Sequence, residues 1–231
     1  MSRLHVREWG KGDRVALLVH GLSTSSRSWW QVGPALAARG YRVVAPDLAG
    51  HGNSPRGRYS RERWADDLLA VMPDGVELAI GHSLGGVLLA MIVERLRPQR
   101  AVYEDPAWYP DSAGGYGAVQ PAIRAMKDWD AAEIRAASPT WSEESVRVRL
   151  GELADWDPDT TCMEYLETAY APVLPLVPSL ILRADPSALI DDQRAEKYRI
   201  AGFETRTVAK TGHFMHFDDF DGFIDGLDGW L

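Results

Sequence analysis

Residues 77–97 read ELAIGHSLGGVLLAMIVERLR, and this stretch decides the fold of the chain. The apolar run at 78–80 is typical of a buried strand, and the longer apolar segment that ends at Pro98 is typical of a helix. Ser83 lies between them in the pattern G-x-S-x-G, where the glycines leave room for strand and helix to pass closely. The stretch therefore predicts a strand, a sharp turn at Ser83 and a helix.

The turn matters because a serine hydroxyl is a weak nucleophile unless it stands clear of its neighbours and beside a base. A tight strand-to-helix turn exposes the hydroxyl and strains the serine backbone. Leu84 would begin the helix, so its N–H lacks an intrahelical partner and can donate to a developing oxyanion. Leu22 follows the apolar run at 15–19, and its N–H is the second candidate donor. The alternative is a glycine-rich turn with a capping serine.

Composition limits the classes of function. The 231 residues suffice for one large α/β domain, with 45% hydrophobic and 25% charged residues. The net charge is −8 and no basic run occurs, so neither nucleic acid nor a membrane is an expected partner. The single cysteine, Cys162, excludes an internal disulfide and a thiolate metal cluster. The first ten residues lack an apolar signal region and no apolar run reaches membrane-span length, so we expect a cytoplasmic protein.

Short apolar strands alternate with helical segments along most of the chain, which predicts an α/β fold with a mostly parallel central sheet and helices on both faces. Residues 4–9 and 15–19 are expected to form a hairpin through the turn at 10–13. Residues 107–177 differ, because helical segments rich in tryptophan lie between two strands. We expect them to form a helical cap, inserted between core segments 1–106 and 178–231.

Polar residues that follow strands are candidate site residues, because ligands bind beyond the carboxyl ends of parallel strands. Ser83, His20, Asp105, the loop at 183–187 and His213 all follow strands and should lie at one edge of the sheet.

The remaining candidates are expected to be structural. The imidazole of His20 should bind loop backbone, and Asp47 and His51 should hold their own loop in shape. We expect His5 and His82 to be structural, with His82 pointing away from Ser83, and His216 to be structural or at the surface.

Four motifs then occur in order: H-G at 20–21, P-D-L-x-G-H-G-x-S at 46–54, G-H-S-x-G-G at 81–86 and G-H-F at 212–214. Together they resemble the α/β-hydrolase superfamily over essentially the whole chain. The resemblance implies the α/β-hydrolase fold and the chain order nucleophile, acid, histidine. It also implies that Ser83 is the nucleophile, that His213 is the general base, and that Leu22 and Leu84 supply the oxyanion N–H groups.

The acid departs from the common pattern of this superfamily. That pattern places it after the strand near 180–182, where alignment puts Ser187, with Asp185 two residues early. A minority of the superfamily, haloalkane-dehalogenase-like enzymes among them, place the acid after the preceding strand, where Asp105 lies. We predict Asp105, with Asp185 and Glu104 as alternatives. The acid must reach the far nitrogen of His213 to fix its tautomer.

These residues predict a serine hydrolase that cleaves a carboxylic ester or lactone of a small to medium hydrophobic substrate through an acyl-enzyme. No metal or organic cofactor is expected, and the protein should be a monomer or homodimer. Two alternatives remain: a C–C bond hydrolase or lyase on the same triad, and a non-catalytic small-molecule receptor. Dehalogenase and epoxide hydrolase activity are disfavoured, because family members with those activities use an aspartate nucleophile. Candidate substrate-pocket residues in the cap are Trp108, Tyr109, Met126, Trp129 and Trp141.

Overall fold

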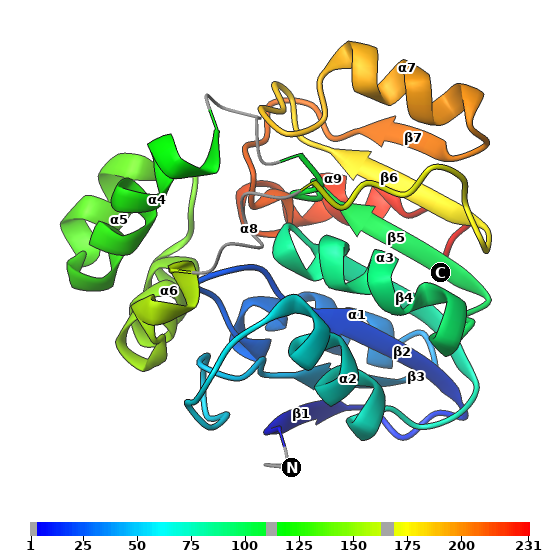
Figure 1. The fold of residues 1–231 in the computed structure, drawn as a ribbon, viewed down its shortest axis with the longest axis horizontal. Helices are drawn as coiled ribbons and strands as arrows, with labels where there is room; N and C mark the ends of the chain where they lie inside the picture. The colour runs from blue at the N-terminus through cyan, green and yellow to red at the C-terminus, as the bar shows by residue number, and fades with distance from the viewer. Residues whose placement is uncertain (1–3, 110–114, 163–168) are drawn as a thin grey trace.

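A computed structural model describes residues 4–109, 115–162 and 169–231 (Figure 1). Within these ranges seven strands form one sheet in the order β1-β3-β2-β4-β5-β6-β7. All neighbours pair in parallel except β1, which runs antiparallel to β3. The predicted mostly parallel sheet is therefore confirmed. The strands are β1 (Val6–Trp9), β2 (Arg14–Val19), β3 (Tyr41–Pro46), β4 (Val76–His82), β5 (Arg100–Glu104), β6 (Ser179–Arg183) and β7 (Glu204–Thr207).

The predicted hairpin between the first two strands is wrong, because β3 lies between β1 and β2 in the sheet. The connection at 10–13 crosses the start of β3 at very short range. A Cβ on Gly10 would lie 2.3 Å from the Tyr41 carbonyl oxygen, and a Cβ on Gly12 would lie 1.8 Å from that of Gly40. The glycines serve this crossing rather than a tight hairpin turn.

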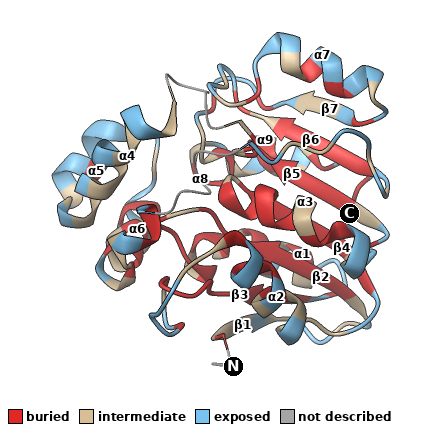
Figure 2. Cartoon of the chain, viewed as in Figure 1, coloured by how far each residue is buried: buried red, intermediate tan, exposed pale blue. Residues whose placement is uncertain are grey.

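Helices cover both faces of the sheet, and most of the sheet between them is buried (Figure 2). One face packs against the 3₁₀ turn η1 (Ser26–Trp29) and the helices α1 (Val32–Ala37), α8 (Met215–Asp218) and α9 (Phe220–Gly226). The other face packs against α2 (Arg61–Val71), α3 (Leu84–Leu96) and α7 (Asp192–Ile200). Side chains of β2 alternate between the two cores, with Ala16 and Leu18 in one and Leu17 and Val19 in the other.

A separate group of helices lies beyond the arrow tips of the central strands in Figure 1. It comprises α4 (Tyr116–Ala125), η3 (Met126–Asp128), α5 (Ala131–Ala137), α6 (Glu143–Asp155) and η4 (Pro158–Thr161). This group has its own small core of Ile134, Val146, Leu153 and Trp156. The predicted limits of the cap, 107–177, include residues outside the described ranges, so those limits stay a prediction. None of the helices in the described ranges combines the length and hydropathy of a membrane span.

Candidate active site

Ser83 occupies the sharp turn between β4 and α3, with φ 53° and ψ −115°. A positive φ is unfavourable for a residue with a Cβ, so the surrounding structure must hold it. The Ser83 N–H donates to the Glu104 carbonyl oxygen at 2.9 Å, and the Ser83 carbonyl oxygen accepts from the N–H groups of Gly86 at 3.0 Å and Ala107 at 3.2 Å. The end of β5 and the first turn of α3 therefore fix the strained serine.

The glycines around this turn are required by close contacts. A Cβ on Gly81 would lie 2.4 Å from the Gly85 carbonyl oxygen, and a Cβ on Gly85 would lie 2.1 Å from that of Val19. Gly21, in the loop after β2, also lies close to the turn, since its Cβ would lie 2.9 Å from His82 Nδ1 and 3.1 Å from Ser83 Cβ. Strand, helix and the loop after β2 therefore meet at the serine with no room for side chains.

His213 pairs with Asp105, the predicted acid. His213 Nδ1 lies 2.7 Å from Asp105 Oδ2, and the carboxylate is almost fully buried, with a side-chain exposure of 2%. An ionised carboxylate only accepts, so Nδ1 carries a proton and Nε2 of a neutral imidazole is left as an acceptor. This is the tautomer that a general base requires.

The two alternative acids lie elsewhere. Asp185 is exposed, and its N–H donates to the Thr211 carbonyl oxygen at 3.1 Å. Glu104 is fully buried and pairs with the buried His216, with 2.6 Å between Oε1 and Nδ1. His216 also stacks on Trp29 with ring centroids 4.7 Å apart. His216 is therefore structural and not at the surface, and Glu104 links β5 to α8.

The prediction that His82 points away from the site is wrong. Its ring lies 4.6 Å from that of His213, and its Nε2 contacts the His213 carbonyl oxygen at 2.9 Å. Burial holds the pKa of His82 well below its ordinary value, so the ring is neutral and Nε2 donates. His82 therefore supports the backbone of His213.

The loop after β2 is ordered by His20, as predicted. His20 Nε2 accepts from the Leu48 N–H at 2.9 Å, so Nδ1 carries the proton that reaches the Gly21 carbonyl oxygen at 2.8 Å. Burial lowers the pKa of His20 and keeps the ring neutral. The Gly21 carbonyl and the Leu22 N–H belong to one trans peptide group, so they point in opposite directions. Holding the carbonyl on His20 thus fixes the direction of the Leu22 N–H.

Asp47 holds its loop, also as predicted. Its carboxylate accepts from the N–H groups of Ser26 at 2.7 Å and Asn53 at 2.9 Å and contacts His5 Nδ1 at 2.9 Å. His51 is buried and its Nδ1 contacts the Ala49 carbonyl oxygen at 3.2 Å.

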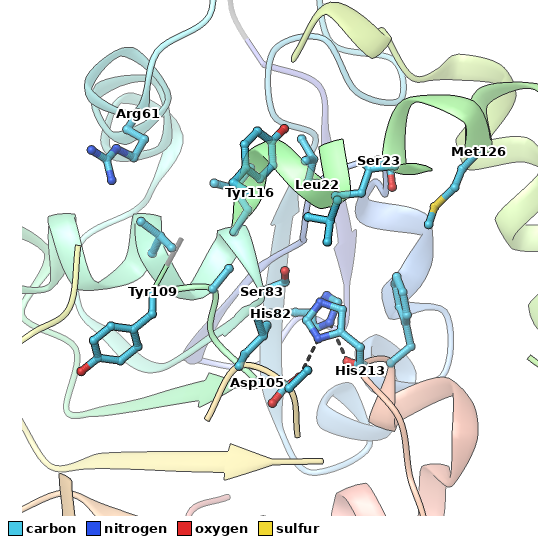
Figure 3. Close-up of a pocket in the computed structure, with 18 of the residues that line it drawn as sticks. Leu22, Ser23, Arg61, His82, Ser83, Asp105, Tyr109, Tyr116, Met126 and His213 are labelled. Atoms are coloured by element: carbon cyan, nitrogen blue, oxygen red, sulfur yellow. Dashed lines mark hydrogen bonds and ion pairs between the residues drawn. The ribbon is translucent and has the colours of Figure 1, made fainter. Parts of the chain in front are cut away.

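A cavity of about 360 Å³ lies over these residues (Figure 3). Ser83, Asp105 and His213 line it, and so do Leu22 and Leu84. In the view of Figure 3, Leu22 lies on the opposite side of Ser83 from Asp105. Its volume falls in the range of small-molecule sites. Its walls are mostly apolar, formed by Val87, Tyr109, Val119, Ile123, Met126, Leu189 and Phe214 among others.

Residues 16–225 match the sequence model of the family described as "Alpha/beta hydrolase family". The chain belongs to the alpha/beta hydrolase family. It is 31% identical over 160 residues to the lipase LipV of Mycobacterium tuberculosis, covering 65% of this chain and 60% of that protein. It is 36% identical over 110 residues to the pimeloyl-[acyl-carrier protein] methyl ester esterase of Aeromonas hydrophila, covering 45% of this chain and 42% of that protein.

Several further curated relatives are matched over shorter stretches, which make up only 24% to 30% of their lengths. Among solved structures, E-2-(acetamidomethylene)succinate hydrolase superposes with a TM-score of 0.82 at 20% identity. That superposition covers 98% of this chain and 94% of the other and shows a shared fold.

Only part of the predicted substrate pocket of this alpha/beta hydrolase matches the cavity. Tyr109 and Met126 line it, but Trp108, Trp129 and Trp141 do not. Trp108 is fully buried in the core and its Nε1 donates to the Gly86 carbonyl oxygen at 3.2 Å. Trp129 and Trp141 pack on the small core of the inserted helices, and Trp141 Nε1 also donates to Asp218 Oδ1 at 2.9 Å. The prediction that these three tryptophans line the substrate pocket is therefore corrected, because they pack in hydrophobic cores instead.

Four further polar residues line the cavity of this hydrolase without a signal in the sequence, namely Ser23, Arg61, Tyr116 and Arg149. Arg149 lies in α6 among other charged residues, and it contacts Ser23, 126 positions away. No local pattern signals a contact over that separation. Within the described ranges, no group of three or more His, Cys, Asp or Glu is arranged to hold a metal ion.

Proposed function

We propose that this alpha/beta hydrolase cleaves a carboxylic ester or lactone through an acyl-enzyme intermediate on Ser83. The 2.7 Å contact between His213 Nδ1 and Asp105, in a cavity that Ser83 lines, carries the proposal. That contact leaves His213 Nε2 as the proton acceptor and stabilises the imidazolium once it forms. The strained turn presents the serine hydroxyl to the same cavity.

The reaction has two halves. Ser83 Oγ attacks the substrate carbonyl carbon while His213 Nε2 takes the hydroxyl proton, and the N–H groups of Leu22 and Leu84 stabilise the oxyanion. Collapse of this intermediate breaks the C–O bond, and the leaving alcohol receives the proton from His213. Water, deprotonated by His213, then attacks the acyl-enzyme, and the second collapse releases the acid and restores the Ser83 hydroxyl.

The substrate class follows from the cavity. Its volume of about 360 Å³ and its mainly aliphatic and aromatic walls favour a small to medium hydrophobic acyl or alcohol group. The similarity to two relatives, a lipase and a methyl ester esterase, supports ester hydrolysis rather than C–C cleavage.

The test is hydrolysis of p-nitrophenyl esters from acetyl to dodecanoyl by wild type, Ser83→Ala and the matched control Ser138→Ala, which changes a serine at the end of α5. Turnover should fall by about 10⁴–10⁶ in Ser83→Ala and stay at the wild-type level in the control. Full activity of Ser83→Ala would contradict the proposal. So would a folded wild type that hydrolyses none of the esters, which would favour C–C chemistry or a receptor.

A further inference from the structure

Helix α6 reaches from the inserted helices to the loop that follows Leu22. Arg149 Nη1 donates to the Ser23 carbonyl oxygen at 2.5 Å, and Nη2 donates to Ser23 Oγ at 2.9 Å. One helical turn further, Glu152 Oε1 accepts from the Ser25 N–H at 2.9 Å and from Ser25 Oγ at 3.2 Å. Two side chains of one helix therefore hold two residues of the loop, beginning directly after Leu22.

The loop needs such support because Ser23 has φ +61°, which is unfavourable for a residue with a Cβ. Arg149 binds both the carbonyl and the hydroxyl of this strained residue. On the other side of Leu22, the Gly21 carbonyl oxygen accepts from Thr24 Oγ1 at 2.8 Å and from His20. The peptide group before Leu22 is therefore held by His20 and Thr24, and the residue after Leu22 is held by Arg149, so the direction of the Leu22 N–H depends on contacts on both sides.

The charged groups of Arg149 and Glu152 are shielded from solvent. Arg149 is 3% exposed and Glu152 is fully buried, with Nη1 and Oε2 3.8 Å apart. Burial lowers the pKa of Arg149 and raises the pKa of Glu152 to about 7. A buried ion pair of this kind is weak evidence for a stabilising role, because a protein often keeps its stability when apolar residues of similar volume replace the pair. The same helix carries Glu144 and Arg147, an ion pair with identical spacing that faces solvent.

Arg149 also lies close to the segment that carries His213. Its guanidinium lies 5.6 Å from the ring centroid of Phe214, the residue after His213, and Arg149 itself lines the cavity. Arg149 therefore touches the loop of the candidate oxyanion donor and the segment of the candidate base from one position.

We propose that Arg149 and Glu152 are positioning residues, which act through Ser23 and Ser25 to hold the Leu22 N–H toward the oxyanion. This inference rests on the proposed acyl-transfer function. Through these two residues, α6 would affect the rate of the chemical step and not only form a wall of the cavity. Both residues act through the loop and neither touches the reacting atoms.

The test compares the double variant Arg149→Met/Glu152→Gln with the matched solvent-facing pair Arg147→Met/Glu144→Gln. In the buried variant, kcat for p-nitrophenyl butyrate should fall about 10²-fold, the scale of losing one oxyanion donor, with KM nearly unchanged. The rate of phosphonylation by a fluorophosphonate should fall in parallel, since that reaction also develops an oxyanion. Arg149→Lys, which keeps the charge but not the two-pronged contact, should recover part of the loss. The solvent-facing variant should match the wild type.

Hydrogen exchange of a peptide spanning residues 20–27 gives a readout independent of turnover, and exchange should be faster in the buried variant. A folded buried variant with wild-type kcat and exchange would overturn the inference while leaving the proposed function intact. A loss confined to KM would also overturn it, because Arg149 would then anchor substrate. If the double variant does not fold, Arg149→Lys decides, because it loses the two-pronged contact with Ser23, and unchanged kcat and exchange there would refute the inference. An inactive wild type would refute the proposed function. Hydrogen exchange would then still test whether Arg149 and Glu152 hold the loop.

Discussion

The hydroxyl of Ser187 donates to Asp105 Oδ1 at 2.5 Å, while the other oxygen of this carboxylate lies 2.7 Å from His213 Nδ1. Ser187 Oγ accepts from the N–H groups of Leu189 at 3.1 Å and Ile190 at 2.8 Å, so its own proton is directed to Asp105. Ser187 stands where the common pattern of the superfamily has its acid. The loop after β6 thus contacts the candidate acid, although the carboxylate itself follows β5.

Removing this contact tests its part in orienting Asp105. In Ser187→Ala we expect kcat to fall about tenfold, because a hydrogen bond to a charged group contributes about 1.5–3 kcal/mol. Ser187→Thr keeps the hydroxyl and should retain most of the activity. Steady-state kinetics on a p-nitrophenyl ester measures both variants. Wild-type kcat in Ser187→Ala would show that Asp105 is held without it.

The choice of acid is tested by Asp105→Asn against Asp185→Asn. An amide at position 105 cannot accept as a carboxylate does and favours the wrong tautomer of His213, so kcat should fall by about 10⁴. Asp185 is exposed, and its replacement should leave kcat within about twofold of wild type. The reverse pattern in the same kinetic assay would mean that the acid is misassigned.

Gly21→Ala tests the close approach of the loop to the serine. The added methyl would lie 2.9 Å from His82 Nδ1 and 3.1 Å from Ser83 Cβ, and the His82 ring is held by its bond to the His213 carbonyl. The loop must then move, and a loss of about 10²-fold in kcat is expected as the Leu22 N–H shifts. Gly57→Ala is the control, because a Cβ there meets nothing within 4 Å. Equal activity of the two variants would contradict this view of the loop.

Glu152 should make stability depend on pH. Burial raises its pKa from 4.5 to about 7, so the folded state favours the protonated form. Its contribution to stability is therefore complete below pH 4.5 and is lost as the pH rises through 7. Relative to Glu152→Gln, the wild type should lose on the order of 3 kcal/mol of unfolding free energy across this window. Urea unfolding of both proteins at several pH values measures this, and parallel pH profiles would contradict it.

Much of the fold could be predicted, because apolar runs and glycine-rich turns are local signals. The turn at Ser83 and the strand before it follow from residues adjacent in sequence. The partner of β1 could not be predicted this way, since β3 comes between β1 and β2 through contacts of residues far apart in the chain. A turn sequence at 10–13 fits a hairpin and a crossing equally well.

In the candidate site too, features set by neighbouring residues could be predicted, and contacts between distant residues could not. Asp105 could be predicted as the acid because it follows a strand and because Ser187 occupies the common acid position after the next strand. The contact between Ser187 and Asp105 could not be predicted, since it joins two loops that are far apart in the sequence. Strand alternation predicts that His82 points away from Ser83, but the positive φ of Ser83 ends that alternation at the turn. The tryptophans of residues 107–177 carry no signal of which way they face, and Trp108 proved to pack in the core.

The central claim is that Ser83 is the nucleophile of an acyl-transfer site, and labelling with a fluorophosphonate tests it most directly. The wild type should take up one phosphonyl group, mapped to Ser83 by peptide mass spectrometry, with esterase activity lost in proportion to labelling. Asp105→Asn should label far more slowly, because His213 then lacks its partner. An active enzyme that stays unlabelled, or one labelled at another residue as its activity disappears, would contradict the account.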